Sequence, residues 1–175
     1  MKIMKNKKVV VKIGSSVLAP GACMDHGLLR GIVEQLCSLL DAGVRICLVS
    51  SGAIVSGIQV MGMKRGTKDI NKKQALAAIG QIRLMDEYTK ELARLGRVAG
   101  QILLTRDDIE DRKRYVNARH TIEALFDMKA LPIVNENDTI SIDEIKFGDN
   151  DNLSARVAAL LGADMLLILS NVEGF

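Results

Sequence analysis

The fold is decided by residues 8–52, which begin KVVVKIGSS and end RICLVSSG. Lys8–Ile13 and Val44–Val49 are short runs rich in β-branched residues, as in buried strands. Between them, residues 28–40 place leucine, isoleucine and valine at helical spacing, and Gly43 follows as a stop signal. A strand, a helix and a second strand in this order are typical of a crossover unit on a parallel sheet, so the stretch predicts an α/β protein.

The same alternation continues along the chain. We expect three more strands, at Val98–Leu104, Leu131–Asn135 and Met165–Leu169. We expect four more helices, at Ala53–Val60, Lys72–Leu95, Asp107–Lys129 and Asn152–Leu161. The pattern predicts a three-layer αβα sandwich with a mainly parallel central sheet.

Three local features add detail to this prediction. Asn71 is expected to cap the helix that begins at Lys72, because asparagine favours the N-cap position. Gly80 inside that helix costs about 1 kcal/mol relative to alanine, which indicates close packing against a neighbour or a bend. The segment Thr139–Phe147 alternates enough to form a small hairpin.

The end of the chain predicts an incomplete domain. Met165–Leu169 resembles an inner strand, and only six residues follow it. An alternating fold would cover such a strand with a further helix, because an exposed strand is an aggregation liability. We therefore expect residues 1–175 to be the N-terminal part of one longer domain.

Composition excludes several classes of protein. The net charge of +3 arises largely from four lysines among the first eight residues, so the remainder is close to neutral and is not a basic nucleic-acid-binding surface. No apolar run has the length of a signal-sequence core or the roughly 20 residues that span a bilayer, so we expect a soluble chain without a membrane partner. Three cysteines without metal-site spacing indicate reduced, buried thiols in a cytoplasmic protein.

Small and polar residues gather at one predicted edge of the sheet. They are Gly14 and Ser15 after the first strand, Ser51 and Gly52 after the second, Asn135 to Asp138 after the fourth, and Asn150 and Asp151 near the start of the last helix. Ligands bind at the carboxyl ends of strands in open α/β sheets. Each loop by itself also fits an ordinary turn or cap. Together, the two clusters rich in asparagine and aspartate could hold the ammonium and carboxylate of an amino acid.

Lys12 is the strongest single candidate for a ligand contact. It lies at the end of an otherwise apolar strand. A buried ammonium without a partner is costly, so this side chain must reach water or meet an anion. We expect it to contact an anionic ligand.

Other chemistries fit the sequence poorly. Neither GxxxxGK[ST] nor a helix-opening GxGxxG is present, which excludes these two nucleotide-binding loops. Asp149 and Asp151 do not continue as a calcium loop, since Leu153 occupies the next ligand position and the required glycine is missing. His26 and His120 lie far apart in the sequence, and we interpret each as a surface residue.

The motifs, taken together, closely resemble those of one known family. They are VVKIGSS from Val10, SSGAI from Ser50, QILLT from Gln101, NEND from Asn135 and GDNDNLS from Gly148. This combination is similar to the glutamate 5-kinase branch of the amino acid kinase family, from about Lys8 to Phe175. The match is specific, because acetylglutamate kinases carry glycine-rich loops in place of SSG and aspartate kinases carry Gly-Gly-Thr in place of GSS.

The resemblance implies ATP-dependent phosphorylation of the γ-carboxylate of L-glutamate to L-glutamyl 5-phosphate, the first step of proline biosynthesis. It implies that Lys12 contacts the transferred phosphoryl group and that Asp151 orients the lysines. The implied substrate pocket consists of Ser51, Gly52, Asn135, Asp138 and Asn150. The implied nucleotide contacts are Lys12, Gly14, Ser15, Ser170 and Asn171. The family's later glycine-rich segment with a second lysine does not occur in these 175 residues.

The resemblance also implies ATP and Mg²⁺ as cofactors, proline as a feedback inhibitor, and a homo-oligomer, either a dimer or a tetramer. Residues 1–175 would be the substrate-binding part of a single kinase domain whose nucleotide-binding part is largely absent, so we expect this chain by itself to be inactive or nearly so. Two alternatives stay open. One is another phosphotransferase of the same superfamily, acting on a phosphate or a carbamate, and the other is a catalytically inactive glutamate-binding fragment.

Overall fold

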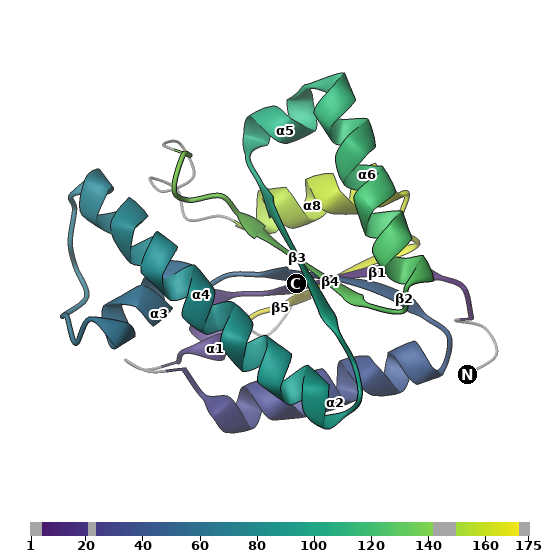
Figure 1. Cartoon of the computed structure of the whole chain (residues 1–175), viewed down its shortest axis with the longest axis horizontal. Coiled ribbons are helices and arrows are strands. Elements are labelled where there is room, and N and C mark those ends of the chain that lie inside the picture. The colour runs from purple at the N-terminus through teal and green to yellow at the C-terminus, as the bar shows by residue number, and fades with distance from the viewer. Residues whose placement is uncertain (1–4, 21–23, 142–149, 172–175) are drawn as a thin grey trace.

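The computed structural model describes residues 5–20, 24–141 and 150–171. In chain order, its elements are β1 (Lys8–Ile13), α1 (Ser15–Leu18), α2 (His26–Asp41), β2 (Arg45–Ser50), α3 (Ala53–Val60), α4 (Ile70–Arg94), β3 (Ala99–Leu104), α5 (Arg106–Glu110), α6 (Arg112–Asp127), β4 (Leu131–Glu136), α8 (Asn150–Leu161) and β5 (Met165–Leu169). Figure 1 shows the strands crossing the middle of the molecule, with α2 and α4 on one side and α6 and α8 on the other.

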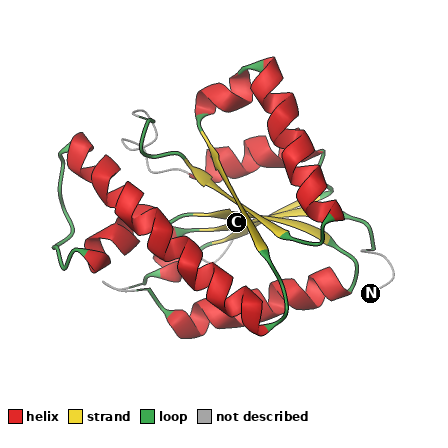
Figure 2. Cartoon of the chain, in the orientation of Figure 1, coloured by secondary structure: helices red, strands yellow, loops and turns green. Residues whose placement is uncertain are grey.

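The five strands form one parallel sheet in the order β3-β4-β2-β1-β5. Helices cover both faces of this sheet (Figure 2), so the predicted three-layer α/β fold is confirmed. Since every strand points the same way, their carboxyl ends meet at one edge. In the register, Ile13 of β1 lies between Ser50 of β2 and Leu169 of β5.

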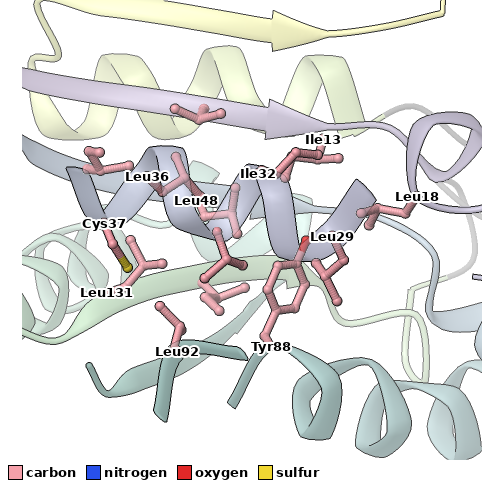
Figure 3. Close-up of a cluster of buried hydrophobic side chains, with 14 of the residues drawn as sticks. Ile13, Leu18, Leu29, Ile32, Leu36, Cys37, Leu48, Tyr88, Leu92 and Leu131 are labelled. Carbon is pink, nitrogen blue, oxygen red and sulfur yellow. The ribbon is translucent and has the colours of Figure 1, made fainter. Parts of the chain in front are cut away.

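Alternate residues of β1 enter two separate apolar clusters. Val9, Val11 and Ile13 pack against α2 and α4, whereas Val10 packs in the cluster that includes α8. Figure 3 shows the first cluster, in which the ring of Tyr88 lies among aliphatic side chains. Lys12 has the same parity as Val10, so its side chain leaves the strand on the α8 face.

Helices α3 and α4 pack with their backbones in contact. A Cβ on Gly80 would lie 1.8 Å from the carbonyl oxygen of Ala53 and 2.3 Å from the nitrogen of Gly57. A Cβ on Gly57 would lie 1.9 Å from the carbonyl oxygen of Leu76. The close packing predicted at Gly80 is therefore confirmed, and it fixes the position of α4 relative to the turn that follows β2.

The predicted cap of α4 is wrong by two residues. Asp69 is the N-cap, and its carboxylate accepts hydrogen bonds from the backbone N–H groups of Asn71 and Lys72. Aspartate and asparagine are both good N-cap residues, but the ionised carboxylate also interacts favourably with the positive end of the helix dipole.

The single helix predicted from Asp107 to Lys129 is also wrong, because two helices occupy this segment. Thr105 and Asp108 form a capping box that begins α5. Asp111 then adopts an extended backbone conformation and accepts a hydrogen bond from the N–H of Arg114, which begins α6. A residue that caps a new helix cannot continue the previous one, so the chain turns at this point.

The last strand, β5, lies at the edge of the described sheet and pairs with β1 only. Met165, Leu167 and Ile168 are exposed, so this apolar strand is uncovered among the described residues, as the sequence analysis expected. Composition shows that this strand is apolar, but it cannot show which neighbours the strand pairs with. The hairpin was predicted at Thr139–Phe147, and most of it, residues 142–147, lies outside the described residues. None of the described helices combines the length and the apolar character that a bilayer-spanning segment requires.

Candidate functional site

Lys12 and Asp151 form an ion pair at the carboxyl end of β1. The Lys12 side chain is 11% exposed, whereas that of Asp151 is 49% exposed. Asp151 lies in the first turn of α8, where the helix dipole favours a carboxylate. The anion that meets Lys12 in this structure therefore comes from the protein itself, and the ammonium lies at the boundary between the core and the open edge of the sheet.

Asn150, the neighbour of Asp151, connects the ends of β2 and β4. Its Nδ2 lies 2.8 Å from the carbonyl oxygen of Ser50, 2.6 Å from Oγ of Ser51 and 3.1 Å from Oδ1 of Asn135. An amide nitrogen carries only two hydrogens, so these three acceptors share two donors. Asn150 thereby brings together three of the five predicted pocket residues, itself included.

Gly52, the fourth pocket residue, is required by the turn after β2. Its φ of 107° lies in the left-handed region, which residues with a Cβ rarely adopt. At this position the chain turns directly from the end of β2 into α3, with Gly52 as the N-cap. The turn leaves Ser51 Oγ within reach of Asn150.

Two residues of α4 form hydrogen bonds with this cluster. Gln81 Oε1 accepts a hydrogen bond of 2.7 Å from Asn135 Nδ2, and the hydroxyl of Tyr88 lies 3.0 Å from Oγ of Ser50. Tyr88 is fully buried, and this burial raises the pKa of its phenol although the hydrogen bond with Ser50 opposes the shift. The sequence analysis assigned neither residue a role in the site. The available signal was a glutamine beside Gly80, on the tightly packed part of the helix.

Asp138, the fifth pocket residue, lines a cavity of about 280 Å³ that borders the cluster. The cavity wall also includes Glu136, Gln81 and Ala53. Gln81 is the hydrogen-bond partner of Asn135, and Ala53 follows Gly52 in the chain, so the cavity and the Asn150 cluster share a wall. Carboxylate and amide groups on this wall can bind the ammonium and carboxylate of a small zwitterion.

The predicted phosphate-binding residues lie at the carboxyl ends of β1 and β5. Ser16, which follows Ser15, donates a hydrogen bond of 3.5 Å from Oγ to Oδ1 of Asn171, the neighbour of Ser170. A Cβ on Gly14 would lie 3.4 Å from Lys12 Nζ, so Gly14 borders this ammonium. A lysine beside small residues fits an anionic phosphoryl group.

A magnesium ion would find few protein ligands in the described residues. Within the ranges given above, no group of three or more His, Cys, Asp or Glu residues could hold a metal ion. Magnesium in kinases is usually held by one or two carboxylates together with substrate phosphates. Asp151, whose carboxylate is half exposed beside Lys12, fits that more limited role.

Comparison with known proteins identifies the family. The profile of the amino acid kinase family matches residues 7–175. The chain belongs to the amino acid kinase family. The resemblance inferred from the five motifs is therefore confirmed, and the all-parallel sheet between two helical layers agrees with it.

Among members of the amino acid kinase family, this chain is similar to several proteins named glutamate 5-kinase. It is 46% identical over 172 residues to that of Geobacter metallireducens, 48% over 168 residues to that of Clostridium acetobutylicum and 47% over 167 residues to that of Thermus thermophilus. These matches cover 95% to 98% of this chain but only 45% to 63% of the relatives. The chain thus spans about half the length of two of these proteins.

Proposed function

We propose that this chain is the substrate-binding part of a glutamate 5-kinase, an enzyme that transfers the γ-phosphoryl group of ATP to the γ-carboxylate of L-glutamate in the first step of proline biosynthesis. One observation carries the proposal. Asn150 and Asp151 are adjacent in the first turn of α8; Asn150 binds the loop after β2 and the end of β4, and Asp151 binds Lys12. The proposed amino acid pocket and the proposed phosphoryl-binding lysine are therefore neighbours.

The chemistry of carboxylate phosphorylation explains why a lysine would be needed there. The γ-carboxylate of glutamate has a reference pKa of about 4.3, so it is ionised at neutral pH and needs no general base. The obstacle is repulsion between two anions, about 4 kcal/mol for a pair of unit charges at 4 Å and an effective dielectric constant of roughly 20. Lys12 would offset this repulsion, and Asp151 would hold its ammonium in place.

The substrate would be held by the groups around Asn150. Ser51, Gly52, Asn135 and Asn150 form the connected part of the proposed pocket. Asp138 would bind the α-ammonium of glutamate, because it is a carboxylate on the bordering cavity. This leaves the γ-carboxylate to point toward Lys12.

ATP would supply the phosphoryl group and Mg²⁺ would neutralise part of its charge. Lys12, Gly14, Ser15, Ser170 and Asn171 are the proposed contacts, and their position at the ends of β1 and β5 supports this role. Inhibition by proline, a homo-oligomeric assembly and a cytoplasmic location belong to the same proposal and rest on the family resemblance. Cys37 and Cys47, both buried thiols, fit a reducing compartment.

Two measurements test the proposal. Isothermal titration of this chain with L-glutamate and, separately, with ATP is expected to show binding of glutamate and weaker or no binding of ATP. A longer protein that contains this chain is expected to form γ-glutamyl hydroxamate when L-glutamate, ATP, Mg²⁺ and hydroxylamine are combined. Binding of a nucleoside monophosphate or of isopentenyl phosphate in place of glutamate would instead favour a different phosphotransferase of the same superfamily.

A further inference from the structure

The hydrogen bonds of Asn135 determine which way its amide points. Its Oδ1 accepts from the backbone N–H of Glu136 at 2.9 Å. A backbone N–H can only donate, so the atom facing it must be the oxygen of Asn135. The other side of the amide, Nδ2, then faces Gln81, and the same oxygen faces Nδ2 of Asn150.

This orientation determines the orientation of Gln81 as well. Because Asn135 presents hydrogens, Gln81 must present its oxygen, Oε1, at 2.7 Å. Its Nε2 then points the other way, where it is buried and has no hydrogen-bond partner among the described residues. A buried donor without a partner is energetically costly. Gln81 therefore keeps this orientation although its Nε2 makes no hydrogen bond among the described residues.

The backbone of α4 gives Gln81 little freedom to move away. The preceding residue, Gly80, lies against the backbone of Ala53 and Gly57, with no space for a methyl group. Gln81 is therefore attached to the most tightly packed point between α3 and α4. Asn135 itself is only 2% exposed, so water does not easily replace Gln81 as its acceptor.

We propose that Gln81 is a positioning residue of the amino acid pocket. By accepting the hydrogen bond from Asn135, it keeps Oδ1 of Asn135 directed at Asn150, which in turn binds Ser51. If the Asn135 amide turned over, its NH₂ group would face the NH₂ group of Asn150, and two donors would oppose each other. The effect of Gln81 on substrate rests on the proposed function, whereas its contact with Asn135 does not.

The contact can be tested by NMR of the side-chain amide of Asn135, assigned by the loss of its signals in Asn135→Asp. Gln81→Met removes the acceptor and keeps the length of the side chain, while Gln81→Glu keeps an acceptor. The exchange rate of the Asn135 NH₂ protons is expected to rise at least about tenfold in Gln81→Met and less in Gln81→Glu. Gln35→Met is the control, because Gln35 bonds only to Gly31 of its own helix among the described contacts. Equal exchange rates in Gln81→Met and the wild type would overturn the proposal.

The role in the pocket is tested by titration of the same variants with L-glutamate. The dissociation constant is expected to rise about tenfold in Gln81→Met, which corresponds to one lost hydrogen bond, and less in Gln81→Glu. The melting temperature of each variant is compared with that of Gln35→Met, so that loss of folding is recognised. Unchanged affinity in Gln81→Met would overturn the role in the pocket. If the wild type does not bind L-glutamate while the Asn135 amide still depends on Gln81, the proposed function fails and the positioning contact stands.

Discussion

The hydroxyl group of Tyr88 lies 3.0 Å from Oγ of Ser50, and both side chains are fully buried. Tyr88 belongs to α4, whereas Ser50 is the last residue of β2. The carbonyl oxygen of the same serine accepts a hydrogen bond from Asn150. The long helix and the start of α8 are therefore attached to the same residue at the edge of the sheet.

Tyr88→Phe is expected to reduce the alkaline sensitivity of folding. Burial raises the pKa of the Tyr88 phenol above its ordinary value near 10, so the neutral form is favoured in the folded state. The resulting contribution to stability is complete below about pH 10, the unfolded value, and is lost as the pH rises above it. Urea midpoints measured between pH 8 and pH 11 should fall less steeply in Tyr88→Phe than in the wild type. The buried thiol of Cys47, whose pKa burial also raises, is present in both proteins. Parallel curves would contradict the assignment.

Gly80→Ala is expected to destabilise the fold although alanine favours helices. The added methyl group would lie 1.8 Å from the carbonyl oxygen of Ala53, so α3 and α4 would have to separate. Overpacking typically costs about 1–3 kcal/mol, and a clash with backbone belongs at the upper end of that range. Gly31→Ala in α2 is the matched control, since its Cβ would meet nothing within 4 Å, and it should stabilise by about 0.5–1 kcal/mol. Urea denaturation measures the change in the free energy of unfolding for each variant. Equal changes in the two variants would contradict the backbone contact between α3 and α4.

Lys12→Ala is expected to abolish most turnover while leaving glutamate affinity nearly unchanged. The lost positive charge acts on the repulsion between the reacting anions, so the rate in an active protein that contains this chain should fall about 10²–10³-fold. Lys113→Ala, on the exposed surface of α6, is the control for removing a lysine. Steady-state kinetics with L-glutamate and ATP separate the two effects. Turnover close to that of the control would remove Lys12 from the mechanism.

Asp138→Ala is expected to raise the glutamate concentration needed for half saturation by about tenfold or more, because an ammonium would lose its carboxylate partner. Asp127→Ala, at the exposed end of α6, removes the same charge away from the cavity. Titration calorimetry on both variants measures the difference. The same dissociation constant in the two variants would show that Asp138 does not contact the ligand.

The positions of the strands could be predicted well from the sequence, because buried parallel strands are short apolar runs between turn residues. Lys8–Ile13 and Met165–Leu169 have the predicted bounds. The caps could not be predicted to the residue, since Asp69 and Asn71 are both suitable and tertiary contacts decide between them. The pairing of β5 with β1 could not be predicted for a related reason. Pairing depends on residues far away in the sequence.

The sequence indicated only some of the contacts among the candidate site residues. The resemblance implied that Asp151 orients the lysines, and the structure shows Asp151 in an ion pair with Lys12. The contact between Lys12 and an anionic ligand stays a prediction. The helix α4 was not expected to contribute, because neither Gln81 nor Tyr88 belongs to a recognisable motif. Gln81 also lies more than 50 residues before its partner Asn135 in the sequence. The contacts that these α4 residues make with the site can be identified only once the packing of the helix against the sheet is known.

The most direct test of the proposed role of this sheet edge is a crystal structure of a protein that contains this chain, soaked with L-glutamate and a non-hydrolysable ATP analogue. The proposal predicts that the α-ammonium of glutamate lies beside Asp138, that the terminal phosphate lies beside Lys12 Nζ, and that the γ-carboxylate faces this phosphate. An amino acid bound elsewhere, or a Lys12 ammonium directed into bulk water and remote from both ligands, would contradict it.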